Sequence, residues 1–143
     1  MSENKEQLEP SVYTVISGSF RKHLQQISFL KKALEHLGIA VLSPAKCGAV
    51  NPDEEFILLD SDPITDPGIL QSSVFAKMRR SAFLVLANFD GYIGKAAALE
   101  IGFAIAIGLK IYALEEVSDP NLAPFCSLPP KARIDSGSTD NEY

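Results

Sequence analysis

The six residues from Ala82 to Ala87 read Ala-Phe-Leu-Val-Leu-Ala, an uninterrupted apolar run that lies between two segments with helical spacing. A strand that is apolar on both faces has to be covered on both, and alternating strands and helices achieve this in a parallel sheet. Further short strand-like runs occupy residues 12–17, which are rich in β-branched residues, the apolar residues 39–42, and residues 110–114. We therefore expect an α/β fold with a single doubly wound, five-stranded parallel sheet, a flavodoxin-like or Rossmann-like three-layer sandwich.

Start and stop signals between these runs predict the helices. The first predicted helix ends at Gly38, a residue type that commonly terminates helices. Asp66 followed by Pro67 predicts the N-cap and first position of a second helix. A third helix is expected from the turn at residues 91–94 to Gly108.

A chain of 143 residues has room for one domain with a substantial core. We expect a disordered leader at residues 1–11, the folded domain at 12–126, and a flexible tail at 127–143, where Ser, Pro and charged residues accumulate.

The net charge of -5 and the absence of a long Lys or Arg run argue against a nucleic-acid polymer as partner. The first ten residues are polar and no apolar run reaches membrane-spanning length, so we expect no membrane partner and a cytoplasmic location. Cys47 and Cys126 have neither metal-ligand spacing nor a disulfide pattern, which favours a reducing compartment and predicts no metal site.

One carboxylate stands out in the third predicted helix. Every residue from Ala96 to Leu109 is apolar or Gly, except Glu100. Helical spacing groups Glu100 with Ala96, Leu99 and Phe103, so the carboxylate is expected among buried side chains. Because burial of an ionised carboxyl is costly, Glu100 needs an ion-pair partner, hydrogen-bond donors, or a reaction that uses a poised carboxylate.

In doubly wound sheets, ligands bind outside the carboxyl ends of the strands, where the strand order reverses. The first segment expected there is Ser17-Gly18-Ser19-Phe20-Arg21. It combines a glycine, two hydroxyls, a helix N-terminus and a guanidinium, which together can hold a phosphate. The alternative is an ordinary solvated helix start.

A second segment runs from Asn88 to Gly94 and includes Gly91 and Tyr92. We expect Asn88, Gly91 and Gly94 to line the site, and Tyr92 either to stack on a ligand ring or to cap the sheet. The segment lacks the Gly-x-Gly-x-x-Gly spacing of dinucleotide sites and the Gly-Lys-Ser/Thr end of a P-loop. No cofactor is therefore expected.

The third segment, between Ser43 and Gly68, is rich in proline and acidic residues. A connection this long is usually a functional loop, and it could offer a carboxylate such as Asp62; a decorative insertion is the alternative. No Ser-His-Asp constellation is present, and His23 and His36 are expected at the surface of the first helix.

Several of these segments together resemble the nucleoside 2-deoxyribosyltransferase superfamily, in particular the branch with the 2'-deoxynucleoside 5'-monophosphate N-glycosidases. The likeness spans about residues 12–114. It rests on 17–21, 41–44 and 56–62, and above all on Gly-Tyr-Ile-Gly at 91–94 followed by Ala-Leu-Glu-Ile-Gly-Phe-Ala at 98–104. The resemblance implies that Glu100 is the nucleophile that attacks the anomeric carbon, that residues 17–21 hold a 5'-phosphate, and that the chain forms a homodimer.

The chain also departs from the pattern of that superfamily. Val74 occupies the place of a helper aspartate, and three further substitutions are Ala82 for Asp, Val15 or Ile16 for Tyr, and Ala96 for Ser. Because the base must leave protonated, Asp62, Asp90 or a hydroxyl would have to replace the missing acid. Two functions therefore stay open: cleavage or exchange of the N-glycosidic bond of a small nucleoside or nucleotide, and non-catalytic nucleotide binding or sensing.

Overall fold

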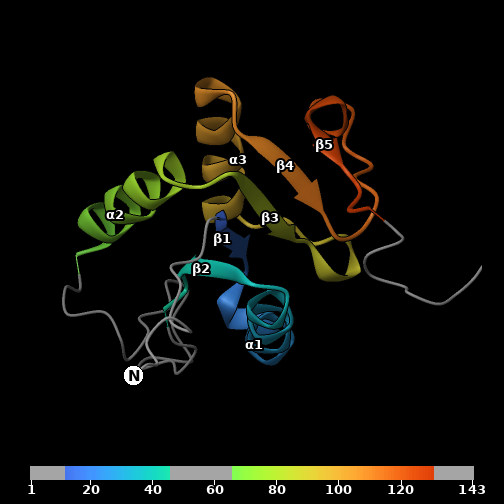
Figure 1. Ribbon diagram of the computed structural model, residues 1–143. Coiled ribbons are helices and arrows are strands. Elements are labelled where there is room, and N and C mark those ends of the chain that lie inside the picture. Colours follow the sequence, from blue (N-terminus) through green and yellow to red (C-terminus); the bar gives the residue numbers. More distant parts are fainter. Residues whose placement is uncertain (1–11, 46–65, 131–143) are drawn as a thin grey trace, which may run out of the picture.

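The computed structural model describes residues 12–45 and 66–130, which contain one five-stranded, all-parallel sheet (Figure 1). The strands are β1 (Val12–Gly18), β2 (Ile39–Ser43), β3 (Phe83–Ala87), β4 (Lys110–Ala113) and β5 (Cys126–Ser127). Their order is β2-β1-β3-β4-β5, the flavodoxin-like arrangement. The predicted fold class is therefore confirmed.

Three α-helices accompany the sheet in the described residues: α1 (Phe20–His36), α2 (Pro67–Arg79) and α3 (Lys95–Ile107). Two short 3-10 turns, η2 (Phe89–Gly91) and η3 (Ala123–Phe125), follow β3 and precede β5. The predicted cap of α2 is present, because the Asp66 carboxylate accepts a hydrogen bond from the Ile69 N–H at 3.0 Å. Helix α3 ends at Gly108, whose φ of 75° is the left-handed conformation that glycine adopts without strain.

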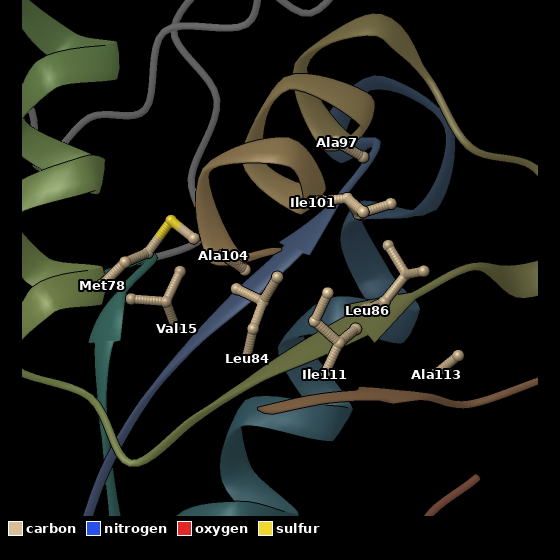
Figure 2. Close-up of a cluster of buried hydrophobic side chains, with 9 residues drawn as sticks. All are labelled: Val15, Met78, Leu84, Leu86, Ala97, Ile101, Ala104, Ile111 and Ala113. Atoms are coloured by element: carbon tan, nitrogen blue, oxygen red, sulfur yellow. The ribbon is translucent and has the colours of Figure 1, made fainter. Parts of the chain in front are cut away.

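The helices cover opposite faces of the sheet, with α1 on one side and α2 and α3 on the other (Figure 1). Alternation along the strands determines which core each residue joins. On the α1 face, Ile16 and Val85 pack with Ile27, whereas Val15 and Leu84 on the opposite face belong to the core of α2 and α3. Figure 2 shows this second core, in which Ala97, Ile101 and Ala104 of α3 point toward the strand side chains.

The fifth strand begins at Cys126, and Ser127 pairs with Tyr112 of β4. The sheet thus extends one residue beyond the domain end expected at 126, into the segment expected to be a tail. Within the described part of the chain, no helix is both long and apolar enough to cross a membrane.

Candidate functional site

A cavity of about 650 Å³ lies at the carboxyl edge of the sheet, where the strand order reverses between β1 and β3. Its walls are residues 18–21 at the start of α1, residues 43–45 after β2, one face of α2, and residues 92 and 94–97 at the start of α3. This volume falls within the range of small-molecule sites, about 300–1,000 Å³.

Two helix N-termini meet at this cavity. Ser19 is the N-cap of α1, where its Oγ accepts a hydrogen bond from the Lys22 N–H at 3.2 Å. The N-cap of α3 is Gly94, which has no side chain with which to cap the helix. The N–H groups at a helix start and the positive end of the helix dipole favour a bound anion.

Glu100 reaches this cavity from the buried face of α3, with only 8% of its surface exposed. Ser17 Oγ donates a hydrogen bond to Oε1 at 2.5 Å, and Gln71 Nε2 donates one to Oε2 at 2.7 Å. Among residues 12–45 and 66–130, no Lys or Arg forms an ion pair with it. The sequence left open whether an ion-pair partner or hydrogen-bond donors accompany the buried Glu100 carboxyl. In the structure it is hydrogen-bond donors that do so.

Burial raises the pKa of Glu100 above the ordinary value for a glutamate carboxyl, and the hydrogen bonds from Gln71 and Ser17 lower it by less. Desolvation dominates because the charged form loses its hydration on entering the protein. The carboxyl is therefore poised to exchange a proton closer to neutral pH than a surface glutamate does.

The raised pKa predicts a pH-dependent stability difference between the protein and its Glu100→Gln variant. As pH rises above the ordinary glutamate pKa of about 4.3, the unfolded chain loses this proton first. The Glu100 contribution to the free energy of unfolding therefore falls until pH passes the folded-state pKa. The introduced glutamine can keep both hydrogen bonds, because its carbonyl accepts from Gln71 and its amide donates to the Ser17 hydroxyl.

Thermal melts of the two proteins between pH 4 and pH 8 check this. Glu100→Gln should match the parent in acid and melt higher at neutral pH, whereas Glu116→Gln, at an exposed glutamate, should show no such trend. A constant difference across the range would contradict the raised pKa.

The apolar niche expected around Glu100 differs from the one in the structure. Ala96 and Leu99 were expected to bury it, but Ala96 is exposed and Leu99 is 55% exposed. The buried residues of α3 are Ala97, Glu100, Ile101 and Ala104, a face that turns toward β1 and β3. The Glu100 carboxyl is thus buried between α3 and its neighbours β1 and α2, which supply Ser17 and Gln71.

The structure brings most of the predicted phosphate loop to the cavity. Gly18, Ser19, Phe20 and Arg21 line it, while the Ser17 hydroxyl is committed to Glu100. Gly18 permits the close packing of the end of β1 against β3 and α1, because a Cβ atom there would lie 3.0 Å from the Ala87 carbonyl oxygen and 3.2 Å from Ile27 Cδ1.

Asn88 and Gly91 were expected in the cavity wall, and the structure places both outside it. The Asn88 side chain is 1% exposed and bonds the backbone of Glu115 twice, donating to its carbonyl at 2.9 Å and accepting from its N–H at 3.0 Å. An amide pairs well with a backbone because it carries both a donor and an acceptor. The Asn88 side chain therefore links the end of β3 to Glu115, just beyond the end of β4. Gly91 has a structural role too, because its φ of 76° lets the chain turn after β3.

Tyr92 and Gly94 do line the cavity. The Tyr92 ring is 42% exposed, and the Lys22 ammonium lies 4.6 Å from its centre. A Cβ atom at Gly94 would lie 3.3 Å from Tyr92 Cε2, so the glycine lets this ring pack beside the start of α3.

His23 was expected at the surface, but it is 6% exposed. Its ring packs edge-on against Phe89, 5.5 Å between centres, and its Nε2 lies 3.8 Å from the Asp90 carboxylate. His23 belongs to the buried stripe of α1 with Ile27, four residues later. It anchors the loop after β3 to α1, and neither His23 nor Asp90 lines the cavity.

Gln71 is the site residue that sequence reasoning missed. Asp62, the expected second acid, lies outside the described residues, and among the described residues that line the cavity Glu100 is the one carboxyl. The cationic side chains in its described walls are Arg21, Lys77 and Lys95. The described walls therefore carry more cationic than acidic side chains, in a protein whose net charge is -5.

No group of three or more potential metal ligands occurs among the described His, Cys, Asp and Glu residues. Comparisons of the chain with protein-family models, with curated proteins and with solved structures found no match.

Proposed function

We propose that this protein cleaves or exchanges the N-glycosidic bond of a nucleoside, a deoxynucleoside or its 5'-monophosphate, with Glu100 as nucleophile. The observation that carries the proposal is a single buried carboxyl between two neutral donors, at the meeting point of two helix N-termini. The likeness of residues 91–104 to the deoxyribosyltransferase pattern supports the same assignment.

The chemistry follows from what surrounds Glu100. When the sugar approaches, positive charge develops at the anomeric carbon and stabilises the ionised carboxylate that burial otherwise disfavours. Ser17 and Gln71 hold one carboxyl oxygen each, which fixes the carboxylate plane toward the cavity. Glu100 then forms a glycosyl ester, and water or a second base releases the sugar in the following step.

The other end of the substrate would lie against the two helix starts. Arg21 and the positive N-terminal end of α3 supply charge and donors for a phosphate. This favours a 5'-monophosphate over a free nucleoside.

A nucleotide-binding or sensing module without catalysis is the second candidate. The observation in its favour is that the described walls of the cavity hold no carboxyl besides Glu100, so no second carboxylic acid there can protonate the leaving base.

One experiment separates the two functions. Incubation with a panel of ribo- and deoxynucleosides and their 5'-monophosphates, followed by chromatography of free base, should give base release from at least one compound. Binding of a panel member by calorimetry without base release would instead assign the sensing function.

We also propose that two copies of the chain pair through the outer face of α3. Leu99 is exposed there, beside Gly102 and Ala106, and the exposed side chains of α3 beyond Lys95 carry no charge. Small residues let two helices approach closely.

Gly102→Leu tests this pairing. In the single chain a Cβ atom at Gly102 meets nothing within 4 Å, so the fold should tolerate the leucine side chain. In a dimer the same side chain would hold the two α3 helices apart. Light scattering should give twice the 15.5 kDa chain mass for the parent and 15.5 kDa for the variant. Ala33→Leu, on the exposed side of α1, is the control, and an unchanged mass for Gly102→Leu would reject this interface.

A further inference from the structure

We propose that Lys77 is the proton donor to the leaving base, an inference that rests on the proposed function. Loss of a base from a sugar leaves an electron pair on a ring nitrogen, and a donor is needed unless the base is already activated. The described walls of the cavity offer no second carboxylic acid for this role. They do offer two ammonium groups, on Lys77 of α2 and on Lys95 at the start of α3, and Lys95 lies at the end of the cavity assigned to the phosphate.

Lys77 belongs to the face of α2 that lines the cavity, together with Leu70, Ser73 and Val74. These positions recur every three or four residues and so share one side of the helix. Gln71, on the neighbouring side of α2, holds Glu100 at 2.7 Å. Lys77 is six residues beyond Gln71, which is about 9 Å along the helix axis. With the sugar held at Glu100, the attached base extends along α2 and the long side chain of Lys77 covers the remaining distance.

The environment of Lys77 leaves its ammonium available for this task. The residue is half-buried, and within residues 12–45 and 66–130 it has no ion-pair partner. The two helix N-termini form other walls of the cavity than α2 does, and they favour the phosphate. A substrate with its phosphate there and its sugar at Glu100 has its base along α2, where Leu70 and Val74 give an apolar surface and Lys77 faces a ring nitrogen or keto oxygen.

The step balances as follows. A Glu100 oxygen bonds to the anomeric carbon, the carbon-nitrogen bond breaks, and its electron pair stays on the base. The Lys77 ammonium gives the base a proton, which yields a neutral base, a glycosyl ester of Glu100 and a neutral lysine amine. In hydrolysis, water then attacks the anomeric carbon of the ester and gives a proton to the Lys77 amine. In exchange, a ring nitrogen of an acceptor base attacks the same carbon and its N–H proton goes to the Lys77 amine. Either route restores the Glu100 carboxylate.

The test compares bases that need a proton with bases that do not. 2'-Deoxyguanosine 5'-monophosphate and its 7-methyl derivative form one pair, since 7-methylguanine leaves as a neutral molecule. 2'-Deoxyuridine 5'-monophosphate and its 5-fluoro derivative form a second pair, since fluorine improves the leaving base. Lys77→Met should lower kcat for the unactivated member of the accepted pair by about 10²-fold or more and change the activated member little.

Two further variants complete the experiment. Lys32→Met, at an exposed position on α1, removes the same charge and should leave both rates unchanged. Lys77→Arg keeps the charge but holds its proton too tightly to give it up, so it should remain slow with the unactivated base.

Equal slowing of both members of a pair by Lys77→Met, no slowing of either, or full activity of Lys77→Arg would overturn proton donation by Lys77. Failure of the parent protein to release any base from the panel is a different result, which would overturn the proposed function and this inference with it.

Discussion

Glu100→Gln is expected to lower base release by at least about 10³-fold while nucleotide binding changes little. The substitution removes the nucleophile but keeps a side chain of the same shape. Its carbonyl and amide can still pair with Gln71 and Ser17, which now bond the two carboxyl oxygens. A nucleophile acts in the transition state and contributes little to ground-state affinity, so kcat should fall and the dissociation constant should stay nearly constant.

Chromatography of released base together with calorimetry of nucleotide binding measures both quantities. Glu116→Gln, which changes the same chemical group at an exposed position, is the matched control and should remain active. If the protein is a sensor, the parent itself releases no base, and Glu100→Gln alters affinity alone. Retention of base release by Glu100→Gln would remove Glu100 from the reaction.

Arg21→Ala is expected to weaken binding of a 5'-monophosphate by about 10- to 100-fold and to leave binding of the corresponding nucleoside nearly unchanged. Hydrogen bonds to a charged group are worth about 1.5–3 kcal/mol, and Arg21 lines the cavity at the start of α1. Because the nucleoside lacks the phosphate, it cannot lose this interaction.

The control for Arg21→Ala is Arg80→Ala, which removes the same charge at the end of α2, where the guanidinium lies 5.6 Å from the Tyr13 ring. It should leave both affinities in place. Equal weakening of nucleotide and nucleoside by Arg21→Ala would show that Arg21 shapes the cavity and does not read the phosphate.

Much of the fold could be predicted because each element carries a local signal. Apolar runs marked four strands, Asp66 and Pro67 marked the start of α2, and Gly108 marked the end of α3. The fifth strand has only the two residues Cys126 and Ser127, too few for any periodic pattern. Its position depends on pairing with β4, which no local stretch of sequence records.

The site was predicted less completely than the fold, because burial of single polar residues depends on tertiary packing. Glu100 was found because it interrupts an apolar helix. Gln71 likewise interrupts an apolar stripe. It lies four residues before Phe75 and seven before Met78, on the side of α2 that packs against α3. The mixed composition of α2 hid that signal, because a second stripe of α2, containing Leu70 and Val74, is also apolar and lines the cavity as well.

His23 and Asn88 were misjudged for a related reason. Both were expected at places where polar residues meet solvent or ligand, and both are buried. Asn88 satisfies its amide on the backbone of Glu115, a partner 27 residues away. Such pairings follow from the adjacency of β3 and β4, which the strand order creates.

The shortness of β5 also bears on how the sheet meets other chains. An edge strand exposes unpaired N–H and C=O groups that can recruit a strand from another molecule and begin aggregation. Here the edge offers only Cys126 and Ser127, and Leu128 is followed by Pro129 and Pro130. Proline has no N–H to donate, so the backbone beyond β5 cannot continue a ladder of hydrogen bonds. The short β5 and the prolines that follow it thus disfavour edge-to-edge growth of the sheet on this side.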